Sequence, residues 1–258
     1  MDLHTHVIPR VDDGAPDTES ALETLRSLYI DGVKTVTATP HLNASDSDGS
    51  RRANVEAAWP RLVRRAQTAL PNLKLCRGFE IQLDSPDPDL SDPALRLAGS
   101  RFALVEFRAF TIPVQSARAL SRIAEAGYVP VLAHPGRYSG YHTGFEIVSE
   151  WRAAGALLQV NGGSLLGEYG NGVRLIAQRF LAEGLIDLIA SDNHARPGRN
   201  LSLRQVWDYL VARGLEEQAR LLLSSNPNRI LEDQMPQRVA AAGDRDGFLA
   251  RLARVFRT

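Results

Sequence analysis

The chain has 258 residues, with 30 basic and 30 acidic side chains, so it carries no formal net charge. A balanced charge gives no general attraction to nucleic acid or to an anionic membrane, which argues against both as partners. The length suits one large domain and is short for two enzyme domains. Cys76 is the only cysteine, which excludes an intrachain disulfide and a thiolate metal cluster.

The sequence contains no sign of a membrane anchor. No apolar run approaches the about 20 residues that a membrane-spanning helix needs. The first residues include histidines, where a signal peptide would have a basic region and an apolar block. We therefore expect a cytoplasmic protein without membrane insertion.

Short strand-like runs, β-branched and alternating at 33–39, are separated by segments with helical spacing along the chain. The predicted strands cover residues 2–6, 33–39, 73–80, 102–107, 128–134, 156–161 and 186–191. The predicted helices lie between an N-cap at Asp17 and Gly32, at 51–70 with a kink or break at Pro60, at 114–126, around Trp151 up to Gly155, at 173–183 and over most of 204–223. Residues 43–50 are small and polar and predict a loop.

Strands separated by helices predict a parallel sheet with right-handed crossovers. Seven strands favour a closed or nearly closed barrel over a doubly wound sheet. The first strand is not followed by the glycine-rich phosphate fingerprint of a nucleotide-binding sheet. We predict an α/β barrel over residues 1–233. Residues 234–258 are predicted to be an amphipathic tail of the same domain that docks on the body or on a second subunit of a homo-oligomer.

Side chains that can bind metals stand at the ends of six predicted strands: His4, His6, His41, Glu80, Glu106, His134, Asp192 and His194. The sixth strand ends on Asn161, which could line the pocket. In barrels the carboxyl ends of the strands meet at one mouth, so we expect these side chains to meet there. Five of the six histidines beside several carboxylates would repel or titrate unless a cation held them.

With Asp13, the candidates number nine, which exceeds the three or four protein ligands of a single catalytic zinc. Two or three metal ions are therefore predicted. Histidine and carboxylate ligands suit Mn, Fe, Zn or Mg. His142 lies in a loop rich in glycine and tyrosine and is not expected to be a ligand.

These segments also carry a family resemblance. His4-Thr5-His6, Asp13-Gly14, Thr39-Pro40-His41, Glu80, Glu106-Phe107, Ala133-His134-Pro135 and Ala190-Ser191-Asp192-Asn193-His194 resemble the polymerase and histidinol phosphatase (PHP) superfamily. The strongest resemblance is to its bacterial protein-tyrosine phosphatases of capsule and exopolysaccharide operons. The opening HTHVIPRVDDGAPDTESAL, the VEF strand and the closing SDNH are the most specific parts, and the likeness runs from residue 2 to about 231.

The resemblance implies a distorted (β/α)7 barrel with a centre of three divalent metal ions, often manganese. The three sites that it implies are His4, His6, Glu80 and Asp192; then Glu80, Glu106 and His134, with Glu80 bridging; then Asp13, His41 and His194. Arg137 and Arg199 match the phosphate-clamping arginines, and Arg196 is a rival for the second role. Gly136 departs from the pattern, because relatives often have an acidic residue there.

The resulting hypothesis is phosphomonoester hydrolysis by a metal-dependent enzyme. Metals lower the pKa of a bound water toward about 7, and the hydroxide attacks phosphorus in line. Arg137 and Arg199 would neutralise charge on the equatorial oxygens. Asp12 could orient a ligand or assist proton transfer.

The expected substrate is phosphotyrosine in a flexible segment, with the tail of a bacterial tyrosine kinase as the natural partner. Residues 43–50 and 136–144 are predicted to form an open entrance, where Tyr138 and Tyr141 would meet the substrate ring. Three alternatives remain at this point. They are a small-molecule phosphatase such as histidinol phosphatase, a nuclease or proofreading relative, and a non-catalytic metal-bound module that regulates a kinase.

Overall fold

The computed structural model describes residues 1–85, 87–140, 145–196 and 201–243. Within them, short strands alternate with helices and every paired strand runs parallel to its neighbour. The strands are β1 (Asp2–Thr5), β2 (Thr35–Ala38), β3 (His41–Asn43), β4 (Lys74–Arg77), β5 (Glu80–Gln82), β6 (Phe102–Glu106), β7 (Val129–Ala133), β8 (Leu157–Asn161) and β9 (Leu188–Ala190).

The strands form two parallel sheets, one in the order β1-β2-β4 and one in the order β3-β5-β6-β7-β8-β9. Short breaks separate β2 from β3 and β4 from β5 along the chain. Backbone hydrogen bonds cross both breaks. The Gly78 N–H donates to the Ala38 carbonyl at 3.0 Å, and the Glu80 N–H donates to the Pro40 carbonyl at 3.1 Å. Each pair of short strands therefore acts as one long strand that is interrupted once.

Contacts between β1 and the end of β9 complete a ring. Thr5 forms a parallel bridge with Asn193. The Asp192 N–H donates to the His4 carbonyl at 2.9 Å, and the His6 N–H donates to the Asn193 carbonyl at 2.8 Å. With the two interrupted strands counted once each, the ring has the predicted seven strand positions. The fold is the distorted α/β barrel of the PHP type, and its distortion consists of the two breaks and the brief contact between β1 and β9.

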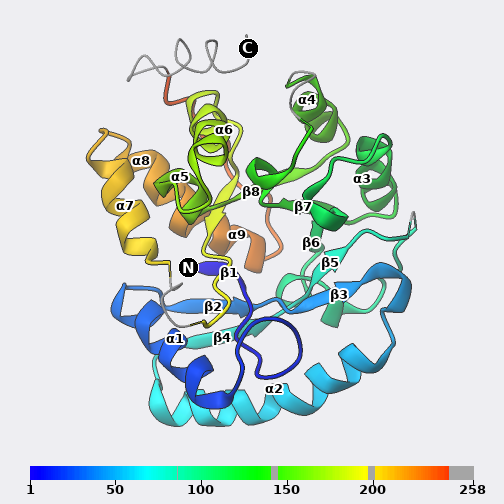
Figure 1. Ribbon diagram of the computed structural model, residues 1–258, viewed down its shortest axis with the longest axis vertical. Coiled ribbons are helices and arrows are strands. Elements are labelled where there is room, and N and C mark those ends of the chain that lie inside the picture. Colours follow the sequence, from blue (N-terminus) through cyan, green and yellow to red (C-terminus); the bar gives the residue numbers. More distant parts are fainter. Residues whose placement is uncertain (86, 141–144, 197–200, 244–258) are drawn as a thin grey trace.

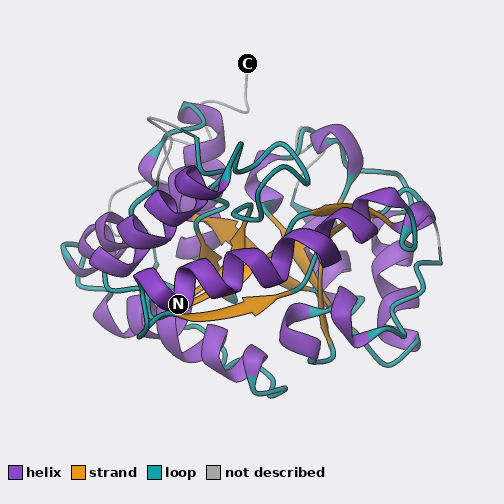
Figure 2. Ribbon diagram, turned by 90° about the horizontal axis from the view of Figure 1, so that it is seen from below, coloured by secondary structure: helices purple, strands orange, loops and turns teal. Residues whose placement is uncertain are grey.

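Helices lie outside the strands (Figure 2). They are α1 (Thr18–Ile30), α2 (Ser50–Ala69), α3 (Ser116–Glu125), α4 (Glu146–Ala153), α5 (Gly162–Leu166), α6 (Asn171–Ala182), α7 (Leu203–Val211), α8 (Glu216–Arg220) and α9 (Asn226–Leu231), with a π-helical turn at Leu221–Ser225 between α8 and α9. In Figure 1, α1 and α2 lie along the side of the ring that contains β2 and β4.

Helix ends follow the local chemistry of the sequence. Asp17 caps α1 as predicted, because its Oδ1 accepts the Ser20 N–H at 2.8 Å. Gly32, Gly127 and Gly155 follow α1, α3 and α4 with φ of 94°, 90° and 87°, a conformation that favours glycine at a helix end. The predicted helix boundaries at these glycines are confirmed.

Three local predictions differ in detail from the structure. The predicted strand at 73–80 is two strands, because the chain breaks between β4 and β5. The predicted loop at 43–50 begins with the last residue of β3 and ends with the first residue of α2, and a 3₁₀ turn at Ala44–Asp46 and further turns lie between them. Pro60 does not break α2, and it lies on the exposed side of the helix, where water can satisfy the carbonyl that loses its partner.

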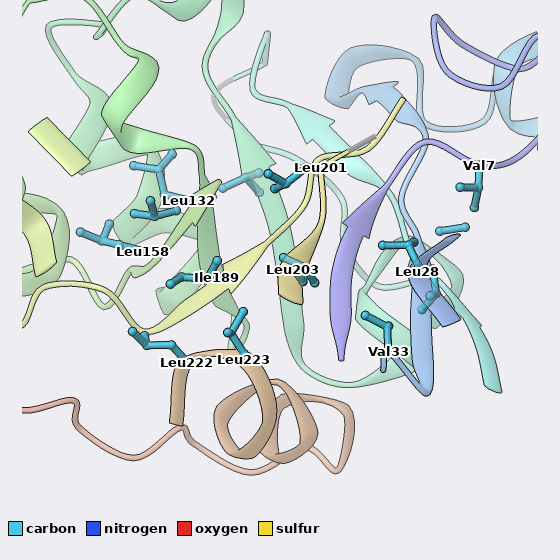
Figure 3. Close-up of a cluster of buried hydrophobic side chains, with 14 of the residues drawn as sticks. Val7, Leu28, Val33, Leu132, Leu158, Ile189, Leu201, Leu203, Leu222 and Leu223 are labelled. Carbon is cyan, nitrogen blue, oxygen red and sulfur yellow. The ribbon is translucent and has the colours of Figure 1, made fainter. Parts of the chain in front are cut away.

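Alternate residues of a strand pack into two separate apolar clusters, since side chains two apart share a face. In β7, Leu132 packs into the larger cluster, whereas Val131 and Ala133 pack into the smaller one. Figure 3 shows part of the larger cluster, including Leu132 and Ile189. The larger cluster joins the outside of the strands to the helices.

Residues 234–243, where the predicted tail begins, run beside α6. Val239 is buried, and the Gly243 N–H donates to the Ala182 carbonyl at 3.1 Å. The amphipathic pattern at 248–256 lies outside the described residues. In the part of the chain that the structure describes, no helix combines the length and the apolar character needed to cross a membrane.

Candidate metal centre

Three strands carry the same change from apolar to polar along one face. The residues on this face are, in chain order, Phe102, Leu104 and Glu106 in β6, then Leu157, Gln159 and Asn161 in β8, then Leu188, Ala190 and Asp192 in β9 and just beyond it. All nine side chains are buried. The apolar residues therefore form a floor, and the polar residues lie above it at the carboxyl ends of the strands.

The structure brings together all nine side chains that the sequence predicted as ligands. Eight of them form three overlapping groups, in each of which the potential ligand atoms lie within 4.8 Å of one another. The groups are His4, His6, Glu80 and Asp192; His41, Glu80 and Glu106; and His6, Asp13, His41 and His194. The ninth, His134, lies beside the second group, with its Nε2 2.7 Å from Glu80 Oε1.

The first group has the dimensions of a metal site. His4 Nε2 and His6 Nε2 are 3.2 Å apart. Glu80 Oε2 lies 3.2 and 3.3 Å from these two nitrogens, and Asp192 Oδ1 lies 3.3 and 3.4 Å from them. Ligands at about 2.1 Å from a tetrahedral ion lie about 3.4 Å apart, so a divalent ion fits among these four atoms.

The hydrogen bonds of three histidines leave the same ring nitrogen for a ligand bond. His4 Nδ1 bonds Gln159 Oε1 at 2.8 Å, His6 Nδ1 bonds Asp12 Oδ2 at 2.8 Å, and His194 Nδ1 bonds the Asp192 carbonyl at 2.9 Å. Each of these oxygens accepts, so each Nδ1 carries the proton. Nε2 then has a free lone pair directed into the cluster, as in neutral histidine ligands.

Unsatisfied buried atoms also fit a cation. Within the described residues, Glu80 Oε2 and Asp192 Oδ1 are buried without a hydrogen-bond partner. An unpaired buried acceptor costs about 1–3 kcal/mol, and more when it is charged. A divalent ion among the four atoms of the first group would satisfy both oxygens.

The second group differs in one member from the set implied by the family resemblance. His41 Nδ1 lies 3.0 Å from Glu80 Oε2 and 3.2 Å from Glu106 Oε1. His134 Nε2 is 3.7 Å from Glu106 Oε2, so it approaches the same two carboxylates from another strand. His41 also reaches the third group, because its Nε2 lies 3.4 Å from Asp13 Oδ1. His194 Nε2 is 3.4 Å from the same Asp13 oxygen.

The carboxylates control the charge of the buried imidazoles. Burial lowers the pKa of His6, but the neighbouring carboxylates of Asp12, Asp192 and Glu80 outweigh it, so the pKa is raised well above its ordinary value. Burial raises the pKa of Glu80, but the neighbouring histidines outweigh it and hold that pKa well below its usual range. A cation among these atoms takes the place of the protons that the carboxylates otherwise hold on the imidazoles.

Outer hydrogen bonds connect and orient the ligands. Gln159 Nε2 donates to Asn161 Oδ1 at 2.9 Å, and Asn161 Nδ2 donates to Asp192 Oδ2 at 2.7 Å. With the bond from His4 to Gln159, this chain links two members of the first group. Asp12 Oδ2 accepts from the His41 backbone N–H at 3.1 Å as well as from His6. Asp12 therefore stands behind the ligand ring, a position that favours the orienting role of its two predicted alternatives.

Two members of the cluster have unusual backbone conformations. His134 has φ of 38° and Asp192 has φ of 57°, in the left-handed region that non-glycine residues seldom adopt. His134 follows directly after β7, and Asp192 lies two residues after the end of β9. Strained residues of this kind gather at functional sites, because the surrounding structure has to hold them there.

Two of the three predicted phosphate-binding arginines lie in the described part of the chain. Arg137 Nη1 donates to Asp192 Oδ2 at 2.9 Å, next to the first group. Arg196 Nε donates to the Asp13 carbonyl at 3.0 Å, so this guanidinium is engaged with the loop after β1. Arg199 lies outside the described residues.

The predicted aromatic entrance needs correction. Tyr138 is buried, and its hydroxyl accepts the Phe107 N–H at 3.0 Å, so it supports the site from below and does not line an opening. Tyr141 and His142 lie outside the described residues. Sequence reasoning missed the two rings that do lie at the mouth, Phe110 and Tyr169, because neither belongs to a recognisable pattern. Burial, with the charge of Asp192 adding to it, raises the pKa of Tyr169 to about 12.

The fold and the cluster together define a PHP-type α/β barrel with a candidate polynuclear metal centre. The chain belongs to the family described as "Capsular polysaccharide synthesis, CpsB/CapC", whose model matches residues 1–232.

Curated relatives and a solved structure are similar over most of the chain. The tyrosine-protein phosphatase YwqE of Bacillus subtilis (strain 168) is 28% identical over 91% of this chain and 92% of its own length. The tyrosine-protein phosphatase CpsB of Streptococcus pneumoniae is 27% identical over 91% of this chain and 99% of its own. A crystal structure from a study of YwqE and CpsB, described as unique metal-dependent tyrosine phosphatases, superimposes with a TM-score of 0.79 at 27% identity and covers 93% of this chain and 99% of that one.

Proposed function

We propose that this chain is a metal-dependent protein-tyrosine phosphatase that binds three divalent ions, manganese being the expected metal. The observation that carries the proposal is that the Asp192 carboxylate contacts both the first group and Arg137. Its Oδ1 faces the two imidazoles of the first group, while its Oδ2 accepts from Arg137. A phosphate bound at the first group would therefore also come within reach of a guanidinium, the side chain best shaped to bind phosphate oxygens.

The eight side chains of the three groups, with His134 beside the second, would hold the ions, and Glu80 is shared between the first group and the second. Bound divalent ions supply a hydroxide nucleophile at neutral pH and positive charge for the phosphoryl oxygens. Arg137 would orient the phosphoryl group and neutralise charge that develops on its oxygens. Arg199 is proposed as a second clamp. Asp12 keeps the proton of His6 on Nδ1 and so holds Nε2 directed into the cluster.

The proposed substrate is phosphotyrosine in a flexible protein segment, such as the tail of a bacterial tyrosine kinase that controls capsule or exopolysaccharide synthesis. The names of the relatives and of the family support this choice. The chemistry agrees, because an aryl oxide is a better leaving group than a serine alkoxide and depends less on a general acid. The barrel and the residues that follow it are proposed to form one cytoplasmic domain.

A substrate panel tests the proposal. The manganese-loaded protein is assayed with phosphotyrosine peptides, phosphoserine peptides and histidinol phosphate, alongside an Asp192→Asn variant and a Glu217→Ala control. Glu217 pairs with Arg220 on the surface of α8, so that control should retain the wild-type rate. Phosphotyrosine should be cleaved much faster than phosphoserine, and Asp192→Asn should lose this activity. Faster turnover of histidinol phosphate than of every phosphotyrosine peptide would instead assign the protein to small-molecule phosphatases.

A further inference from the structure

The Arg137 guanidinium contacts the faces of two aromatic rings. Its Cζ is 4.2 Å from the centroid of the Phe110 ring and 4.6 Å from that of Tyr169. Contacts of this length between a guanidinium and an aromatic face are attractive, because the ring face is electron-rich. The rings come from different parts of the chain, the segment after β6 and the segment between α5 and α6. No more than 23% of the Arg137 side chain is exposed to water.

The chain fixes each ring by a different device. Phe110 has φ of 50°, and its carbonyl accepts the Ser139 N–H at 2.7 Å, which ties it to the segment that carries Arg137. Tyr169 stands between Gly167 and Gly170, whose φ values of 90° and 92° allow the tight turn between α5 and α6. Backbone geometry and contacts thereby place both residues beside Arg137.

The two rings restrict the rotation of the Arg137 guanidinium, which the hydrogen bond to Asp192 alone does not prevent. A single bond through Nη1 allows the guanidinium plane to rotate, and an arginine side chain has about 2 kcal/mol of rotamer entropy to lose. Contact with two rings limits that rotation. Asp192 is the only acceptor of an Arg137 hydrogen bond among the described residues, so most of the five guanidinium N–H groups remain for a ligand.

We propose that Phe110 and Tyr169 form an aromatic clamp that fixes the plane of the Arg137 guanidinium and so prepares it for a phosphate group. Both are positioning residues that act through Arg137. The inference rests on the proposed phosphatase function for its kinetic consequence, but the clamp itself is a property of the protein without substrate. Preorganised donors stabilise a transition state better than donors that have to be ordered during the reaction.

Kinetics of single and double variants test the clamp. Phe110→Leu and Tyr169→Leu should each lower kcat/KM for a phosphotyrosine peptide by about 5- to 30-fold, the range that a cation–π contact of about 1–2 kcal/mol gives. Tyr169→Phe keeps the ring and should stay within about twofold of wild type. In an Arg137→Ala background, Phe110→Leu and Tyr169→Leu should have almost no further effect, because the residue through which they act is gone.

Matched controls separate the clamp from general damage to the site. Val114 lies in the same segment as Phe110, is fully exposed and is not in contact with Arg137, so Val114→Ala should leave kcat/KM unchanged. Metal content should be the same in every variant. Equal losses from Phe110→Leu with and without Arg137, or no loss from either leucine variant, would overturn the proposal.

A second measurement does not depend on activity. In the magnesium-loaded full chain, which is diamagnetic, the order parameter of the Arg137 Nε–H bond should be high and should fall in Phe110→Leu and Tyr169→Leu but not in Val114→Ala. Loss of order in a protein that fails to cleave phosphotyrosine would refute the proposed function and leave the clamp standing. Normal phosphotyrosine hydrolysis with an unchanged order parameter in both leucine variants would refute the clamp alone.

Discussion

The two ends of the candidate metal centre differ in their access to water. At the inner end, the side chains of His4, His6 and Glu80 are 0% exposed and that of Asp192 is 3% exposed. At the outer end, the exposures are 55% for Asp13, 26% for His41 and 22% for His194. We call these sets the inner group and the outer group.

Asp13 and the inner group differ in the elements that carry them. The inner group stands on or directly beside β1, β5 and β9, and the hydrogen bonds of Asp12, Gln159 and Asn161 fix its orientation. Asp13 of the outer group lies in the loop after β1, and its carbonyl and carboxylate interact with the exposed Arg196. Ligands on strands are held more precisely than ligands on loops. We therefore expect the inner ion to be retained and the outer ion to exchange more readily.

The largest effect is expected from Glu80→Ala, since this carboxylate belongs to two groups. The variant should lose about two of three ions. Its kcat/KM should fall on the order of 10³-fold or more, because each metal supplies several kcal/mol of charge stabilisation. Elemental analysis and phosphotyrosine hydrolysis measure the two results. His194→Ala serves as the matched outer-group variant and should lose about one ion. Equal metal losses in both variants would remove the distinction between the inner and the outer group.

Arg137→Ala should lower kcat/KM for phosphotyrosine by about 10²- to 10³-fold, the loss typical of a missing oxyanion contact. Metal content should remain that of the wild type, because Arg137 touches the inner group through the outward oxygen of Asp192 and is not a ligand. Steady-state kinetics with parallel elemental analysis check both statements. Near-normal turnover would show that the inner group operates without this guanidinium.

Asp12→Ala should weaken the inner site without removing a ligand. The hydrogen bond from His6 Nδ1 fixes the ring and its tautomer, and loss of such an outer partner costs about 10- to 100-fold in metal affinity. Competition with a metallochromic chelator measures the affinity, and Asp12→Asn is the control that keeps an acceptor for His6. An inner site that binds as tightly in Asp12→Ala as in the wild type would contradict the orienting role.

The smallest effect is expected from Arg196→Ala. Its bonds to Asp13 are partly exposed, and exposed pairs contribute about 0–1 kcal/mol, so kcat/KM should change less than about fivefold. Dilute chelator should remove one ion first from the wild type, and more readily from this variant. A loss of kcat/KM as large as that of Arg137→Ala would instead make Arg196 a phosphate ligand and extend the reactive site to the outer group.

The sequence by itself determined the barrel and the membership of the cluster. Short apolar and β-branched runs located all seven strand positions, and parallel strands in a barrel bring their carboxyl ends to one mouth, so residues as distant as His4 and Asp192 could be expected to meet. The N-cap at Asp17 and the helix ends at Gly32 and Gly127 were equally predictable, because they depend on local backbone chemistry.

Only the tertiary structure decided the geometry within the cluster. The position of His41 between Glu80 and Glu106 depends on a second strand that begins at His41, directly after the break that Pro40 marks, and no local pattern indicates that strand. The burial of Tyr138 and the pairing of Phe110 with Tyr169 around Arg137 join segments that are far apart in the chain. Which side chains meet across such distances depends on the packing of the whole barrel, and neither period nor propensity encodes that packing.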